Sequence, residues 1–148
     1  MPRENLDEAS LLGDKVRKWS LPVFHGPPRP GSAGVKRLFL KQGELAQFYD
    51  GEEGMHYMAF VALRPQSLRG NHYHKCKREW LYLIDGELSL LLENIGSRER
   101  IVLELHAGDL TLIEPRIAHT LLPKQPGQAI EFSPIRFDPA DIYPYTLT

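Results

Sequence analysis

Short apolar runs recur along the chain from residue 35 onward, each separated from the next by polar or turn-forming residues. At Glu99–Leu105 apolar residues occupy every second position, which is typical of a half-buried strand. Asp85-Gly86 lies between two such runs and predicts a hairpin turn. The predicted strands are Val35–Leu40, Leu45–Tyr49, Met55–Leu63, Leu81–Ile84, Glu87–Leu92, Glu99–Leu105, Leu110–Ile113, Ile117–Leu121 and Ala129–Phe137.

These strands follow one another at intervals of about 8–12 residues, which favours an all-β sandwich or barrel. The chain has 12 glycines and 12 prolines among its 148 residues, a frequency that also favours short strands joined by turns. No internal repeat is present. The sequence therefore predicts one all-β domain over residues 35–148.

Residues 1–34 follow a different pattern. Their first half predicts a short N-terminal helix, with one apolar face formed by Leu6, Ala9, Leu11, Leu12 and Val16. The segment Ser20–Gly34 is rich in proline, and proline lacks the backbone donor that a central strand needs. We expect residues 1–34 to form an arm that lies on the barrel or on a partner subunit; a disordered tail is the alternative.

Composition and charge exclude several classes of protein. The formal net charge is −1, so there is no general attraction to nucleic acid or to an anionic membrane. No apolar run approaches the roughly 20 residues that span a bilayer, and the charged N-terminus has no apolar signal-peptide centre. The single cysteine, Cys76, rules out an intrachain disulfide and makes the reducing cytoplasm the expected compartment.

Three histidines and one carboxylate form a candidate metal site. His72 and His74 lie two residues apart, so in a strand both imidazoles point to the same side. Glu79 follows on the next predicted strand, and His119 lies on a later one. Such a set suits Zn, Mn, Fe, Co or Ni without selecting among them. The alternative is that the four are ordinary polar residues lining the interior.

The spacing of these residues resembles the first motif of the cupins: His-x-His, four residues, Glu79, six residues, Gly86. The second cupin motif resembles Gly108 through His119. The resemblance covers roughly residues 55–137 and implies a double-stranded β-helix, the cupin jelly-roll barrel, with His72, His74, Glu79 and His119 as metal ligands. The chain departs from the motifs at turn positions, which are Gln66, Glu114, Arg116 and Pro123.

The local sequence around the histidines and near the C-terminus is similar to that of one group of cupins. The segment Arg69–His74, RGNHYH, resembles the C-terminal cupin domain of capsular-polysaccharide UDP-sugar enzymes, and Phe137-Asp138-Pro139 with Asp141 and Tyr143 is similar to the closing segment of that domain. The same broad group includes epimerases and ketoisomerases of 4-keto-6-deoxy sugars. The resemblance implies a nucleotide-sugar substrate and an isomerase that acts α to a ketone.

In that chemistry a base removes a proton beside the carbonyl, and a metal or a cation holds the charge of the enolate. The candidate bases are His72, His74 and Tyr57. Arg69 and Arg116 are candidates for binding a diphosphate or polarising the carbonyl, because guanidinium offers two parallel donors. The basic run of Lys75, Lys77 and Arg78 is interpreted as a solvated turn. An iron-dependent dioxygenase and a non-catalytic binding protein are the alternative functions.

The pattern of the strand that carries Glu79 also predicts which side chains pack against the arm or a second subunit. If Glu79 points inward, Trp80, Tyr82 and Ile84 point away from the metal site. We expect these side chains to pack under the N-terminal arm or at the seam of a homodimer.

Overall fold

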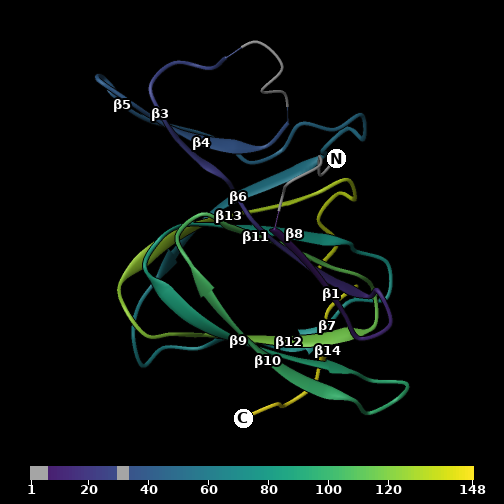
Figure 1. Ribbon diagram of the computed structural model, residues 1–148. Coiled ribbons are helices and arrows are strands. Elements are labelled where there is room, and N and C mark those ends of the chain that lie inside the picture. The colour runs from purple at the N-terminus through teal and green to yellow at the C-terminus, as the bar shows by residue number, and fades with distance from the viewer. Residues whose placement is uncertain (1–6, 30–33) are drawn as a thin grey trace.

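The computed structural model describes residues 7–29 and 34–148, and within these ranges the chain forms strands, turns and loops but no helix. Two sheets face each other, and a third, smaller sheet lies beyond one of them (Figure 1). No helix in this part of the chain is long and apolar enough to cross a membrane. The six-stranded sheet has the order β1 (Asp7–Leu11), β2 (Val16–Ser20), β11 (Asp109–Ile113), β8 (Glu79–Asp85), β13 (Gly127–Ser133) and β6 (Tyr57–Leu63).

The five-stranded sheet faces it with the order β10 (Arg100–His106), β9 (Glu87–Asn94), β12 (Ile117–Pro123), β7 (Arg69–Tyr73) and β14 (Tyr143–Pro144). The small sheet consists of β3 (Val23–His25), β4 (Lys36–Leu40) and β5 (Gly43–Gln47). From β6 to β13 the chain passes repeatedly between the two large sheets. This is a jelly roll, so the predicted all-β class is confirmed, although the sheets do not close into a barrel.

The predicted N-terminal helix is wrong. In the described part of that segment the chain forms the hairpin β1–β2, because Leu12, Gly13 and Asp14 adopt positive φ angles of 50°, 62° and 64° that turn the chain back on itself. Strand β2 then pairs with β11. Trp19, on β2, is fully buried. Residues 16–20 therefore belong to the large sheet and do not lie outside it; residues 1–6 and 30–33 of the expected arm are outside the described residues.

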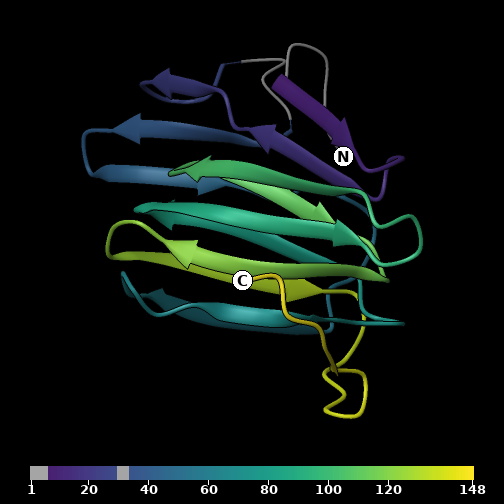
Figure 2. The same cartoon turned by 90° about the horizontal axis from the view of Figure 1, so that it is seen from below.

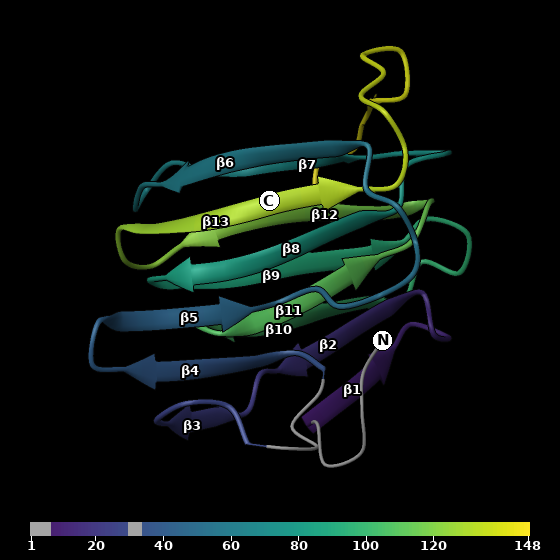
Figure 3. The ribbon, with the colours of Figure 1, turned by 90° about the horizontal axis from the view of Figure 1, so that it is seen from above.

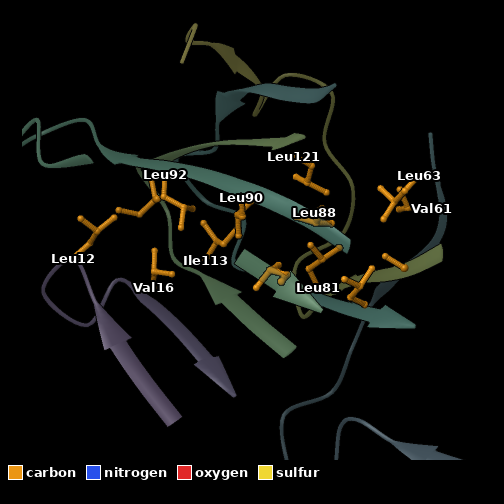
Figure 4. Close-up of a cluster of buried hydrophobic side chains, with 14 residues drawn as sticks. Leu12, Val16, Val61, Leu63, Leu81, Leu88, Leu90, Leu92, Ile113 and Leu121 are labelled. Carbon is orange, nitrogen blue, oxygen red and sulfur yellow. The ribbon is translucent and has the colours of Figure 1, made fainter. Parts of the chain in front are cut away.

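Alternating apolar residues of both large sheets fill the space between them (Figure 4). Leu81 and Leu83 of β8 face Leu88 and Leu90 of β9, and all four are buried. Burying one such side chain stabilises the fold by about 1.5–3 kcal/mol. This core occupies the middle of the sandwich and leaves one end for polar residues.

The outer face of the six-stranded sheet carries a second apolar cluster. Trp80 and Tyr82 alternate with Leu81 and Leu83 and therefore point outward, as predicted. They are covered by the chain itself, because Phe48 stacks on Tyr82 with ring centroids 4.5 Å apart. Figure 3 shows β5, which leads to Phe48, running beside this sheet. Trp19 and Leu21, from the N-terminal 34 residues, belong to the same buried cluster. The chain's own N-terminal segment therefore helps to cover this face, as one of the two alternatives expected, and the alternative of a dimer seam at Trp80 and Tyr82 is wrong.

Candidate active site

Three of the predicted residues meet at one end of the sandwich. His72 on β7 and His119 on β12 are register partners, and their ring centroids are 4.8 Å apart. His74 lies directly after β7, with its ring centroid 5.0 Å from that of His72. The nitrogen atoms that these imidazoles could offer to a metal all lie within 4.8 Å of one another.

Gly70 explains how two strands bring the imidazoles so close. Its φ is +110°, a conformation that favours glycine, and a Cβ at this position would lie 2.4 Å from the backbone oxygen of His119. The register between β12 and β7 also shifts between His119 and Thr120. The Arg-Gly-Asn-His segment therefore has a steric reason for its glycine.

Glu79 reaches the cluster from the opposite sheet. Its Oε2 atom lies 3.0 Å from Nε2 of His119, and both side chains are buried. The other ring nitrogen of His119, Nδ1, lies 3.0 Å from the backbone oxygen of Ile117. Burial alone lowers the pKa of His119, but the Glu79 carboxylate and the Ile117 carbonyl raise it above its ordinary value. Burial opposes the charge of Glu79, yet His119 and Lys77 hold its pKa below the ordinary value.

The pKa values of His72 and His74 are shifted in the opposite direction from that of His119. Burial, followed by repulsion from the neighbouring imidazoles, lowers the pKa of His72 to about 4. Burial also lowers the pKa of His74. The Nδ1 atom of His74 lies 2.7 Å from the backbone oxygen of Asp141, whereas its Nε2 atom is buried without a hydrogen-bond partner in the described structure.

Two further charged residues at the site were missed by the sequence analysis. Lys77 is 7% exposed, and its ammonium lies 3.0 Å from Glu131 and 3.4 Å from Glu79. The interpretation of Lys77 as a solvated turn residue is therefore wrong. Glu131 lies on β13 and alternates inward with the buried Ala129, so an acid inside an apolar strand was the signal that could have found it.

A pocket of about 260 Å³ opens onto these residues. The side chains and backbone that line it are Val61, Arg69, Gly70, His72, Glu79, His119, Leu121 and Glu131. Arg69 lines the pocket, and its guanidinium donates to the backbone oxygen of Ala62 at 3.2 and 3.3 Å. Arg116 is exposed in a turn outside this lining, and only its backbone N–H meets the site, donating to the oxygen of His74 at 2.7 Å.

Tyr57 lies at the border of the site on β6. The ammonium of Lys77 is 4.4 Å from the centroid of its ring, and Phe137 stacks against it. Burial and the carboxylate of Glu131 raise the pKa of Tyr57. A phenol with a raised pKa stays protonated at neutral pH, so Tyr57 is a candidate for a neutral donor and not for the base.

The remaining histidines and the cysteine lie elsewhere. His106 is exposed and pairs with Glu87 at 2.8 Å. His25 stacks on Phe39, and Nδ1 of His56 lies 2.9 Å from the oxygen of Pro134. Cys76 is exposed beside the site, and its thiol is outside the metal-ligand cluster.

Comparison with known proteins gives one family match. The family model described as "Polysaccharide biosynthesis C-terminal domain" matches residues 41–123, which is more than half of the chain. This range contains all four predicted metal-ligand residues. Among curated proteins no sequence match was found.

Several solved structures are similar to this chain. A dTDP-6-deoxy-D-glucose-3,5-epimerase from Legionella pneumophila, solved with dTDP-4-keto-L-rhamnose, superposes with a TM-score of 0.73 at 12% identity, covering 95% of this chain and 77% of the epimerase. A dTDP-4-dehydrorhamnose 3,5-epimerase from Sulfolobus tokodaii gives 0.71 at 15% identity, with coverages of 93% and 80%. A TDP-quinovose 3,4-ketoisomerase from Campylobacter jejuni gives 0.65 at 13% identity, with coverages of 74% and 87%. At these identities the likeness supports the jelly-roll fold.

Proposed function

The chain belongs to the polysaccharide biosynthesis C-terminal domain family, and from that premise we propose that it is an isomerase or epimerase of a nucleotide-linked 4-keto-6-deoxyhexose. The observation that carries the proposal is the pocket in which His72 lies beside the buried His119–Glu79 pair and Arg69. The similar solved structures include epimerases and ketoisomerases of such sugars. Fold alone does not fix an activity, so the site residues bear the argument.

His72 is the proposed base. It is half-buried, lines the pocket and offers a ring nitrogen to a molecule bound there. His74 is a weaker candidate, because it is buried behind the pocket lining and its Nδ1 is engaged by Asp141. A positioned imidazole that removes a proton α to a ketone accelerates the reaction by about 10²–10⁴-fold.

Removing that proton leaves an enolate whose negative charge must be stabilised. Both ring nitrogens of His119 face acceptors, the Glu79 carboxylate and the Ile117 carbonyl, an arrangement that favours the imidazolium. Together with the ammonium of Lys77 it would supply positive charge beside the pocket. Both are buried, and a fixed charge acts more strongly where water is excluded. Return of the proton to the other face of the same carbon gives the epimer. If the hydroxyl proton of that carbon moves to the enolate oxygen, the abstracted proton returns instead to the former carbonyl carbon, and the product is the ketoisomer.

Arg69 is the proposed ligand of the diphosphate. It is exposed at the pocket mouth, and its contact with Ala62 fixes the direction of the guanidinium. Guanidinium matches phosphate oxygens with two parallel donors. The position of Arg116 outside the lining gives no comparable support for a role in binding.

The same imidazoles fit a divalent transition metal. Their candidate ligand atoms cluster within 4.8 Å, and the buried Nε2 of His74 lacks a partner within the described ranges. We propose that His72, His74, His119 and Glu79 are the residues that would hold such an ion. When bound, it would supply Lewis-acid polarisation of a carbonyl. In the metal-free site His72 is available as the base.

The homodimer and the cytoplasmic location remain part of the proposal. With the Trp80 face covered, the support for a dimer moves to β6, an edge strand on which Met58 and Phe60 are 68% and 61% exposed. Exposed apolar side chains on an unpaired edge favour association. Light scattering tests this, since a particle near 16.9 kDa would contradict the dimer.

Turnover of defined sugars tests the function. The protein is incubated with UDP- and dTDP-linked 4-keto-6-deoxyglucose, and the products are identified by proton NMR. We expect a new epimer or keto isomer with one of them, and a loss of about 10²–10⁴-fold in rate for His72→Asn. His106→Asn is the matched control, because His106 is exposed and far from the pocket lining. If neither nucleotide sugar changes, the proposal is wrong.

A further inference from the structure

The C-terminal segment is attached to the strand that carries the histidines. Strand β14 pairs with β7, so that Tyr143 lies opposite Tyr73 and Pro144 opposite His72. The N–H of Tyr145 donates to the backbone oxygen of Asn71 at 2.7 Å. Figure 2 shows this segment, in yellow, crossing the sheet close to its edge. The site is therefore bordered by residues far from it in sequence.

Asp141 is a buried acid of this segment. Its carboxylate accepts the backbone N–H groups of Lys75 at 2.8 Å, Cys76 at 3.2 Å and Lys77 at 3.0 Å. Three donors converging on one carboxylate fix the turn that joins His74 to Glu79. The same turn carries Lys77 into the site.

The backbone of Asp141 acts on His74 directly. Its carbonyl oxygen lies 2.7 Å from Nδ1 of His74, and a carbonyl only accepts hydrogen bonds, so Nδ1 carries the proton. The lone pair of the neutral ring is then on Nε2, the buried atom without a partner. The hydrogen bond made by one ring nitrogen thus determines what the other nitrogen can do.

We propose that Asp141 is a positioning residue of this site: its side chain holds the 75–77 turn, and its carbonyl fixes the Nδ1–H tautomer of His74. This inference rests on the proposed function for its catalytic consequence, although the tautomer itself does not depend on any activity. In this role Asp141 connects the C-terminal segment of the chain to the site.

The test is long-range ¹H–¹⁵N NMR of the histidine rings at neutral pH, with His74 assigned from the signals that disappear in His74→Gln. We expect the Nδ1–H tautomer in the wild type. In Asp141→Ala the turn loses its anchor, and the population should shift toward the Nε2–H form that a free imidazole prefers. Asp141→Asn keeps one acceptor oxygen and should retain more of the native tautomer, a rescue that mere loss of folding would not produce.

Kinetics with the nucleotide sugar provide the second readout. We expect kcat of Asp141→Ala to fall by about 10–100-fold, the usual effect of losing a supporting partner, while KM stays nearly constant because Arg69 is untouched. Asp138→Asn is the matched control: Asp138 is an exposed acid in the same segment, and its side chain accepts the N–H of Ala140 at 2.9 Å.

The two proposals fail in different ways. An Nδ1–H ring in the wild type that shifts in Asp141→Ala supports the positioning role even if neither sugar reacts, in which case the proposed function is wrong. If His74 keeps the Nδ1–H tautomer in both Asp141 variants, or already shows Nε2–H in the wild type, the role of Asp141 is wrong whatever the activity.

Discussion

His119 and Glu79 form a buried pair that joins the two large sheets, with Nε2 of His119 3.0 Å from Oε2 of Glu79. His119 comes from the five-stranded sheet and Glu79 from the six-stranded sheet. Each is less than a tenth exposed. The pair therefore ties the fold together at the point where the proposed chemistry takes place.

Removing one partner should destabilise the protein strongly. In Glu79→Gln the imidazolium of His119 loses its carboxylate while it remains buried, and breaking such a pair costs about 3–5 kcal/mol. Urea unfolding at neutral pH measures the change. The control is Glu8→Gln, which breaks the surface pair of Glu8 and Arg17 and should cost less than about 1 kcal/mol. Equal losses in the two variants would contradict the buried pair.

Gly70→Ala should disturb both stability and the histidine cluster. The added Cβ would lie 2.4 Å from the backbone oxygen of His119, at a φ of +110°. Backbone strain of this kind costs about 1–3 kcal/mol before the clash is counted. Gly54→Ala is the control, since a Cβ there meets nothing within 4 Å. Thermal unfolding compares the two, and a Gly70 variant as stable as the Gly54 variant would refute this packing.

Metal binding should depend on the histidines together. When the metal-free protein is incubated with a divalent transition metal and then dialysed, elemental analysis should find the ion in the wild type and not in His74→Ala, which should also lose the stabilisation that a bound ion gives. Metal and proton compete for the same lone pair of His72, so excess metal should slow proton exchange. Metal content that survives in His72→Ala/His119→Ala would show that the ligand assignment is wrong.

Tyr82 should lose its proton at a higher pH than an ordinary tyrosine. Burial is the main cause that raises its pKa to about 12, against an ordinary value of 10.0. The folded state therefore keeps this proton between pH 10 and 12, where the unfolded state loses it. The resulting contribution to stability is complete below pH 10 and disappears as the pH rises toward 12. Tyr82→Phe lacks this contribution, so its free energy of unfolding should fall less between pH 9 and 12 than that of the wild type.

The titration of Tyr82 would also test whether Phe48 covers the outer face of the six-stranded sheet. Phenolate absorbance identifies the late group by its absence in Tyr82→Phe. If Tyr82 instead titrates near pH 10 in the folded protein, the ring of Phe48 does not shield it as the 4.5 Å stack indicates.

Local patterns in the sequence predicted most of the strands. The run predicted at Glu99–Leu105 forms β10, shifted by one residue, because alternation is a property of the strand itself. The run at Ala129–Phe137 was predicted too long: β13 ends at Ser133, before Pro134. The N-terminal segment was misassigned because helical spacing of apolar residues also fits a tight hairpin. Trp19 stabilises that hairpin by packing in the sheet, a contact with distant strands that local spacing does not encode.

The sequence predicted part of the candidate site and missed the rest. The spacing of His72, His74 and Glu79 is local, and the cupin resemblance supported the inclusion of His119, which is distant in sequence. Glu131 and Asp141 were missed because their roles arise from long-range contacts; Asp141, for example, binds a turn more than 60 residues away. Lys77 was misread because its burial depends on Glu79 and Glu131 together, and a sequence shows only that it is a lysine in a basic run.

Solvent exchange at the carbons beside the ketone directly tests whether His72 removes a proton next to the carbonyl of a nucleotide sugar. The wild-type protein is incubated in D₂O with UDP- and dTDP-linked 4-keto-6-deoxyglucose, and deuterium at C3 and C5 is measured by NMR and mass spectrometry. We expect deuterium at one or both carbons, at a rate that falls by about 10²–10⁴-fold in His72→Asn and is unchanged in His106→Asn. Sugars that bind but exchange no faster than without protein, or a His72→Asn variant as fast as the wild type, would contradict it.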